Sequence, residues 1–186
     1  TMNVGLKDYI NVNYPASKSD LCTVFIEVLP SFTFEKGKYG FIVPPSWLFL
    51  SSFENLRYKI LVNQKIDSLL YLSRGVFGAD FGSVATVISN ETPEKNSTGT
   101  YLKLVERTFQ EFHQGHLDEL FLLSNGDPTF KYKFSDYSKD NARLFNSDDG
   151  LKVYYSDISQ NNFLKVPGNP ILFWISEIIL QSFKGQ

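Results

Sequence analysis

Two strand-like runs joined by a glycine-rich linker constrain the fold of this chain more than any other feature. The runs are Ile66–Leu72 and Val84–Ile88, and both are rich in the β-branched, aromatic and aliphatic residues that suit strands. No helix-length segment lies between them, so a parallel crossover connection has no room. The two runs are therefore predicted to be antiparallel neighbours in a sheet.

The linker itself, Ser73–Ser83, is longer than the roughly two to five residues of an ordinary hairpin loop. It combines several glycines with two large apolar side chains, Phe77 and Phe81. Glycine permits close approach of a backbone, and an aromatic ring in such a loop offers a flat face to a ligand. The alternative is that both rings fold back onto the core, because phenylalanine is usually buried.

Composition places the chain among globular proteins and excludes several classes. Hydrophobic residues make up 42% and charged residues 20% of its 186 residues. A formal net charge of -2 argues against a chain that holds a nucleic-acid backbone by itself, since that requires a basic face. The single cysteine, Cys22, rules out an internal disulfide and fits a reducing cytoplasm. No apolar run approaches the roughly 18 residues that span a bilayer, so a cytoplasmic protein without membrane contact is expected.

Before the linker, the pattern predicts alternating helices and strands, which is typical of an α/β sheet. Ser19 is placed to cap a helix, and Pro30, which lies within the apolar stripe of that helix, is expected to kink or shorten its last turns. Tyr39–Val43 is predicted to be a short buried strand. A second helix follows, with Ser51 and Glu54 at the spacing of a capping box.

The remaining segments are less regular. Residues 1–15 are polar and are interpreted as a surface loop or lead-in. Beyond the linker, Tyr101–Val105 is predicted to be a strand and Phe109–Leu123 a weakly patterned helix, whereas 127–150 is predicted to be loop or hairpin. Near the end of the sequence, Pro170 is placed at the first turn of a terminal helix.

No cluster of side chains predicts a metal centre or a catalytic nucleophile. His113 and His116 share a face if they are helical, but the spacing is common and no cysteine lies nearby, so solvated polar residues are the preferred interpretation. Cys22 has Asp20 as a neighbour but no histidine, which argues against a catalytic thiolate. No metal is therefore expected.

Three segments taken together resemble the second half of the amino-group DNA adenine methyltransferases. In chain order they are Asp20–Glu27, Gly37–Leu48, and Gly75–Phe77 followed by Ser83–Ile88. Further segments resemble a narrower branch of that family, the large adenine methylases of phage-defence (BREX-type) and fused type II restriction-modification systems. These segments are Asn13–Leu21, Phe49–Arg57 and Val166–Trp174.

The resemblance implies a Rossmann-like α/β sheet, mostly parallel, whose last two strands form an antiparallel hairpin. This chain would hold the C-terminal part of that sheet, followed by a mixed α+β segment. Residues 1–92 would form the C-terminal half of the methyltransferase catalytic domain, and residues 93–186 a linker and a segment leading toward target recognition.

The same resemblance implies S-adenosylmethionine as cofactor, double-stranded DNA as partner, and a target adenine flipped out of the duplex. Phe77 would stack on the flipped base. Phe25 would line the pocket around the adenine ring of the cofactor, and Asp20 stands at the start of the same motif. Phe81 is interpreted as a packing residue that braces the loop.

Two family elements are absent from these residues: the glycine-rich cofactor turn and the catalytic Asn/Asp-Pro-Pro-Tyr/Phe loop, which holds the exocyclic amine during methyl transfer. Pro44–Pro45 is not that loop, because Val43 and Ser46 stand where the amide or acid and the aromatic residue belong. No catalytic residue is therefore expected here, and the chain is interpreted as an inactive fragment of a larger enzyme.

Two alternatives stay open at this point. One is a non-catalytic protein-binding or assembly module, and the other is a methyltransferase that acts on RNA or protein. A fragment of a sheet also exposes a strand edge and apolar helix faces, so self-association is expected.

Overall fold

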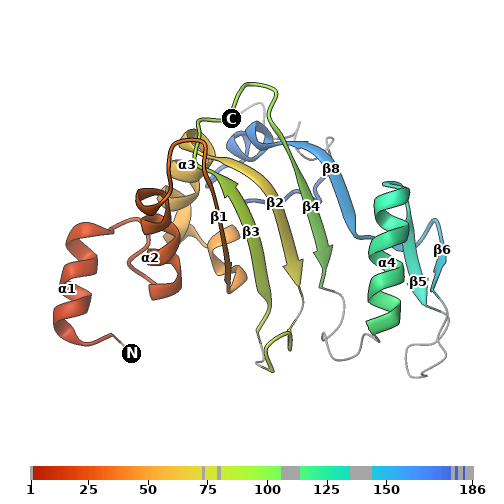
Figure 1. The fold of residues 1–186 in the computed structure, drawn as a ribbon, viewed down its shortest axis with the longest axis horizontal. Coiled ribbons are helices and arrows are strands. Elements are labelled where there is room, and N and C mark those ends of the chain that lie inside the picture. The colour runs from red at the N-terminus through yellow and green to blue at the C-terminus, as the bar shows by residue number, and fades with distance from the viewer. Residues whose placement is uncertain are drawn as a thin grey trace.

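A five-stranded mixed sheet with the order β1-β3-β2-β4-β8 forms the centre of the structure (Figure 1). The computed structural model describes residues 2–72, 74–78, 81–105, 114–134 and 144–176, together with residues 179 and 182. The strands of this sheet are β1 (Lys38–Val43), β2 (Lys65–Leu72), β3 (Ser83–Ser89), β4 (Thr98–Leu104) and β8 (Tyr154–Ser159).

The predicted hairpin is confirmed, because β2 and β3 are antiparallel neighbours with Leu72 paired to Ser83. β1 is also antiparallel to β3, and β4 is parallel to β2, so β1, β2 and β4 all run in one direction. Their last residues, Val43, Leu72 and Leu104, therefore lie at one end of the sheet, which we call the carboxyl end. The linker that follows β2 starts there.

The opposite end, the amino end, is held together by a polar cluster around a β-bulge. The register of β2 against β3 shifts between Ile66 and Ser68, which leaves Asp67 as an extra residue. The Asp67 carboxylate accepts hydrogen bonds from the Lys38 ammonium and from the Ser89 hydroxyl, the latter at 2.6 Å. This cluster joins β1, β2 and β3 at the point where β1 and β2 begin.

Helices cover one face of the sheet. They are α2 (Leu21–Val28), which continues into the 3₁₀ helix η1 (Leu29–Phe32), then η2 (Pro45–Leu48), η3 (Ser51–Phe53) and α3 (Glu54–Asn63). The core between these helices and the strands is apolar and closely packed, and its fully buried side chains include Trp47, Leu48, Leu56, Leu61, Leu69 and Ile88. Alternation along β2 and β3 supplies the strand side of this core.

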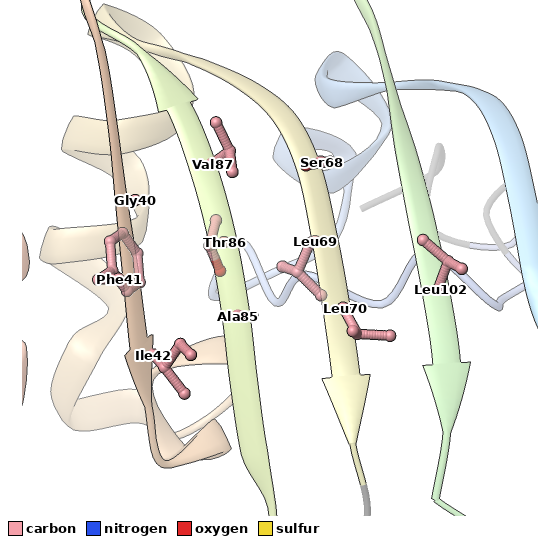
Figure 2. Close-up of a pocket in the computed structure, with 10 residues that line it drawn as sticks. All are labelled: Gly40, Phe41, Ile42, Ser68, Leu69, Leu70, Ala85, Thr86, Val87 and Leu102. Atoms are coloured by element: carbon pink, nitrogen blue, oxygen red, sulfur yellow. The ribbon is translucent and has the colours of Figure 1, made fainter. Parts of the chain in front are cut away.

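The other face of the sheet is not covered by a helix of the described residues, and it carries an open apolar hollow of about 500 Å³. Figure 2 shows the residues of β1, β3, β2 and β4 that line it. Ile42 is 57% exposed on this face and Val87 is 38% exposed. The pairings β1–β3, β3–β2 and β4–β8 are antiparallel, and antiparallel sheets commonly have one face in water, so it is the apolar character of this face that is unusual.

A smaller unit packs beside β4 and β8. It consists of α4 (Gln114–Gly126) and a three-stranded sheet with the order β6-β5-β7, formed by β5 (Lys131–Phe134), β6 (Leu144–Asn146) and β7 (Leu151–Lys152). Its buried residues are Leu104, Leu117, Leu120, Phe130, Tyr132 and Val153. The antiparallel pair β5–β6 confirms the hairpin predicted within 127–150. The part of the predicted helix from Gln114 to Leu123 is confirmed, and 109–113 lies outside the described residues.

The strands β4 and β8 belong to residues 93–186, yet they lie in the same sheet as β1, β2 and β3. A 3₁₀ helix, η5 (Gln160–Lys165), follows β8. The predicted boundary between residues 92 and 93 stays a prediction. Within the described part of the chain, no helix has both the length and the apolar character needed to cross a membrane.

The prediction for the first fifteen residues is wrong, because Val4–Asn13 forms the helix α1. Asn3 caps it by accepting a hydrogen bond from the Leu6 N–H at 2.9 Å. Ile10 is the one buried residue of this helix, so the apolar stripe that normally reveals a helix is missing.

The predicted caps of the next two helices also differ from the structure. Asp20 rather than Ser19 caps α2, with its carboxylate accepting from the Cys22 N–H at 2.9 Å. Ser51 lies within η3, and the residue at the cap of α3, Phe53, makes no side-chain cap bond. The predicted kink is confirmed, since α2 tightens into η1 around Pro30.

The terminal helix predicted from Pro170 does not begin there. Residues 170–176 form turns and irregular structure, because the Ile171 N–H donates to the Leu48 carbonyl at 2.9 Å and holds this segment against η2. A tertiary hydrogen bond to a distant segment thus replaces the local helical one.

Candidate functional site

The carboxyl end of the sheet is where a site is expected, because ligands of open α/β sheets bind outside the carboxyl ends of the strands. Three chain segments meet there: the residues that follow Val43, the loop after Leu72, and the chain that leaves β4 at Leu104. The described part of the loop after β2 is 74–78 and 81–82.

The turn that carries Phe77 depends on glycine at two positions. Gly75 has φ 91° and Gly78 has φ 71°, a region that side chains disfavour. The Gly78 N–H donates to the Gly75 carbonyl at 3.0 Å, which closes the turn. Phe77 lies between these two residues and its side chain is 65% exposed. The ring therefore does not fold back onto the core.

Phe81 is also outside the core, with half of its side chain exposed (50%). That exposure contradicts the prediction that Phe81 is a packing residue. The next residue, Gly82, explains how the chain returns to the sheet: a Cβ added there would lie 3.0 Å from the Leu72 carbonyl oxygen and 3.6 Å from Pro45 Cγ. Only glycine allows this close return without displacing its neighbours.

A row of aromatic rings runs across the carboxyl end beside the loop. The ring centroids of Phe49 and Tyr71 are 6.4 Å apart, and those of Tyr71 and Trp174 are 6.0 Å apart; both pairs are tilted. The Lys103 ammonium lies 4.9 Å from the centroid of the Trp174 ring, within the range of a cation–π contact. Burial raises the pKa of the Tyr71 phenol, so the row stays uncharged apart from the lysine.

The buried side chain of Arg57 joins the two chain segments that carry Phe49 and Trp174. Its guanidinium is 1% exposed and donates to the carbonyls of Trp47 at 2.9 Å and Leu50 at 2.7 Å. It also donates to the carbonyls of Gly168 at 2.6 Å and Asn169 at 3.1 Å. Burial lowers the pKa of Arg57, but an arginine remains charged in proteins.

Sequence reasoning found the segments that hold Arg57, Trp174 and Phe49 but assigned no role to these residues. The signal that was available is their occurrence in the two branch-specific segments Phe49–Arg57 and Val166–Trp174. The structure shows that the arginine of the first segment binds the turn of the second.

Asp20 and Phe25, the predicted cofactor residues, both belong to α2. Its last turn continues into η1, where the Asn90 side chain donates to the Pro30 and Thr33 carbonyls at 3.1 and 2.8 Å. Asn90 follows β3 at the amino end of the sheet, so α2 runs away from the carboxyl end and begins on the side where the Phe77 loop lies.

The exposed surface of α2 is apolar at its beginning. Phe25 is 61% exposed and Leu21 is 37% exposed, whereas Thr23, Val24 and Ile26 are buried. Burial, and then the charge of the Asp20 carboxylate, raise the pKa of the Cys22 thiol. A thiolate is therefore disfavoured at this position.

Among the described residues, no group of three or more His, Cys, Asp or Glu side chains is arranged to hold a metal ion. His113 lies outside the described residues, so whether it shares a helix face with His116 is not tested.

Residues 1–77 match the family of Eco57I restriction-modification methylases. Over 175 residues the chain is 30% identical to the adenine-specific methyltransferase PglX of Lacticaseibacillus casei (strain Zhang), a match that covers 92% of this chain and 12% of that protein. The resemblance predicted from the sequence is confirmed. The adenine-specific methyltransferase BrxX of Escherichia coli O9:H4 (strain HS) is 29% identical over 186 residues, which is 98% of this chain and 13% of that protein.

The chain thus spans about an eighth of the length of these two adenine methyltransferases. Among solved structures, a type I restriction-modification system methyltransferase subunit from Streptococcus thermophilus superposes with a TM-score of 0.53. That superposition covers 88% of this chain and 33% of that subunit at 10% identity, so it shows the fold alone. The mixed α/β fold is that of a restriction-modification methyltransferase, whereas the Rossmann-like arrangement stays a prediction.

Proposed function

We propose that this chain forms the target-base side of an S-adenosylmethionine-dependent DNA adenine N6-methyltransferase of a restriction-modification or phage-defence system. The observation that carries the proposal is the Phe77 ring, 65% exposed in a glycine turn at the carboxyl end of the sheet. The similarity to adenine-specific methyltransferases supports adenine as the target.

The role of Phe77 is to stack on an adenine that has left the duplex. Removing a base from the stack costs a few kcal/mol, and stacking on an aromatic side chain contributes roughly 1 to 3 kcal/mol per base. A ring that is 65% exposed suits this task, because most of its surface is available before the base arrives.

The cofactor fits the exposed beginning of α2. An apolar, solvent-facing ring such as Phe25 is suited to line the pocket of an adenine group, and Asp20 caps the N-terminus of the same helix with a carboxylate that accepts hydrogen bonds. S-adenosylmethionine would supply the methyl group from its sulfonium. The residues of this chain would hold the cofactor and the base, while no residue described here performs the transfer.

We propose further that the chain alone does not transfer methyl groups, because its 186 residues contain neither the glycine-rich cofactor turn nor the Asn-Pro-Pro-Tyr-like loop. Its net charge of -2 agrees with a DNA backbone that is held mainly by other parts of the enzyme. A cytoplasmic location follows from the proposed DNA substrate.

The test is equilibrium binding of the chain to a duplex that carries one unpaired, bulged adenine, measured at low ionic strength. Phe77→Ala is expected to weaken binding on the order of tenfold, because one base–aromatic stack is lost. Phe77→Tyr keeps a ring and is expected to bind as the original chain does. Phe34→Ala is the matched control, since Phe34 is 91% exposed but precedes β1 at the amino end.

Equal binding by Phe77→Ala and Phe34→Ala would contradict the proposal. A parallel assay of methyl transfer from labelled S-adenosylmethionine to duplex DNA tests the second statement. Turnover by the chain alone would show that the proposed inactivity is wrong.

The second candidate is a protein-binding or assembly module, and the exposed apolar residues near β1 favour it. Phe32 is 80% exposed, Phe34 is 91% exposed and Ile42 is 57% exposed, and the outer edge of β1 pairs with no strand of the described residues. Such surfaces favour self-association. Light scattering is expected to show dimers or larger species, and a monomer at every concentration would contradict this candidate.

A further inference from the structure

Phe81 differs from Phe77 in how the backbone holds it. Phe77 lies between two glycines with positive φ in a turn closed by one hydrogen bond of 3.0 Å. Phe81 directly precedes Gly82, whose backbone packs against the Leu72 carbonyl oxygen and against Pro45. One residue later, Ser83 is paired with Leu72 in the sheet. Phe81 is therefore attached to a fixed point of the sheet, whereas Phe77 is attached to a glycine turn.

The position of Phe81 at the carboxyl end, together with its exposure, distinguishes it from exposed phenylalanines such as Phe32 and Phe34. Phenylalanine is among the residues most often buried, yet Phe81 is 50% exposed in the same loop that carries the proposed base-stacking ring. Phe32 and Phe34 are even more exposed, but they precede β1 and so lie at the amino end of the sheet. At the carboxyl end, Phe49 has a ring partner in Tyr71, and the loop rings are the more exposed ones.

A flipped adenine leaves a gap in the duplex, and Phe77 does not fill it because its ring stacks on the flipped base. When one base leaves the duplex, the neighbouring base pairs lose a stacking partner, and a gap opens between them. Proteins that distort DNA often place an apolar side chain between base steps in such gaps. The side chain has to be uncharged, and it has to be held rigidly enough to resist closing of the stack.

We propose that Phe81 is this wedge: it enters the duplex beside the flipped adenine and packs against the adjacent base pair, while Phe77 stacks on the flipped base. The assignment rests on the proposed function of Phe77. The two rings thus have separate partners, one in the duplex and one outside it. Phe81 is a positioning residue that keeps the adenine extrahelical, and it takes no part in methyl transfer.

The test uses the full chain and three probes of equal length at low ionic strength: a duplex with a central abasic site, a duplex with a bulged adenine, and a single strand of mixed sequence. Phe81→Ala is expected to weaken binding to the abasic duplex on the order of tenfold. Binding to the single strand is expected to change less than about twofold, because a wedge needs intact base pairs.

Leucine substitutions separate the two roles, because an apolar wedge does not have to be aromatic whereas a stacking platform does. Phe81→Leu is expected to keep most of the affinity for the abasic duplex. Phe77→Leu is expected to lose affinity for the bulged adenine and for the single strand. Melting temperatures of all variants are measured first, and half-exposed side chains are expected to leave them unchanged.

The outcomes distinguish this inference from the proposed function. If Phe81→Ala binds the abasic duplex as tightly as Phe34→Ala does, while Phe77→Ala remains impaired on the bulged adenine, the wedge is overturned and the stacking role stands. If Phe77→Ala is unimpaired as well, both fail. Absence of binding by the original chain to all three probes also overturns both.

Discussion

Two regions of this molecule reverse the usual distribution of polar and apolar side chains. Around α3, the fully polar side chains of Arg57 and Gln160 are buried, with 1% and 2% of their surface exposed. In the loop after β2, Phe77 and Phe81 are exposed instead. The first arrangement ties distant segments together through backbone hydrogen bonds, and the second leaves apolar surface uncovered.

The difference indicates where stability and binding reside. The polar groups of Arg57 and Gln160 bind backbone partners, which makes the loss of either side chain costly because those partners would stay buried without a hydrogen bond. The exposed rings have little folded-state packing to lose. Substitutions around α3 are therefore expected to affect folding, and substitutions in the loop are expected to affect binding only.

The largest effect is expected for Arg57→Met. It removes the donors that bind the carbonyls of Trp47, Leu50 and Gly168 and leaves those oxygens buried, at a cost of about 3 kcal/mol or more in the free energy of unfolding. Urea denaturation measures it. Lys59→Met is the control on the same helix, because the Lys59 side chain is 52% exposed in its ion pair with Glu27 and should contribute less than about 1 kcal/mol. Equal losses of unfolding free energy for Arg57→Met and Lys59→Met would contradict the idea that the buried polar side chains carry the stability.

Gln160→Leu is expected to cost about 2 to 3 kcal/mol by the same reasoning. The Gln160 amide donates to the carbonyls of Leu61 at 2.8 Å and Gln64 at 2.6 Å, and its oxygen accepts from the Ile66 N–H at 2.9 Å. The control is Asn162→Ala, two residues further along η5. Thermal unfolding of the two variants measures the difference in their stability. A Gln160→Leu protein as stable as its control would show that these bonds are dispensable.

Asp67→Asn is expected to have a smaller effect that depends on pH. Burial raises the pKa of Asp67, but hydrogen bonds from Lys38 and Ser89 and the charges of Lys38 and Lys65 leave it below its usual value. The folded state thus favours the ionised carboxylate, so its stabilisation is present above the unfolded pKa of about 3.9 and is lost as pH falls through the lower folded value.

At neutral pH the substitution at Asp67 is expected to cost at most about 1 kcal/mol, since the Lys38 side chain is 61% exposed and solvent screens the pair. Melting temperatures of Asp67→Asn and of the original chain are expected to differ at pH 7 and to converge toward pH 3. A difference that grows as the pH falls would contradict the assignment.

The smallest effect on stability is expected for Phe77→Ala, within about 0.5 kcal/mol, because the ring is 65% exposed. Urea denaturation with the same protocol as for Arg57→Met measures it directly. A loss as large as that of Gln160→Leu would mean that Phe77 packs in solution, and the contrast between the two regions would disappear.

The sequence predicted those parts of the fold that follow from local pattern. The hairpin of β2 and β3 was predictable because no helix fits between them, and the glycines indicated a special turn around Phe77 although composition left open whether its ring is exposed. The helix α1 was missed because its one buried residue, Ile10, leaves no periodic stripe. Local pattern carries no signal for a helix of that kind.

The rest was hidden because its partners are distant in the chain. Arg57 and the Gly168 carbonyl are 111 residues apart, and Gln160 and the Ile66 N–H are 94 residues apart. A buried arginine or glutamine is exceptional among these residue types, so neither was predicted to lie in the core. For the candidate site, the sequence indicated Phe77 by resemblance, whereas the exposure of Phe81 depends on the backbone at Gly82.

The parallel pairing of β2 with β4 sets a fixed spacing at the carboxyl end. Leu72 and Leu104 are paired, so the chain leaves the two strands at the same level. After β2 the chain enters the Phe77 loop, and after β4 it continues toward α4. A slip of one residue in this pair would shift one exit by about 3.3 Å and turn every side chain of the strand to the opposite face. The register of β2 and β4 therefore sets the distance between the loop that holds the proposed base-stacking ring and any element that follows β4.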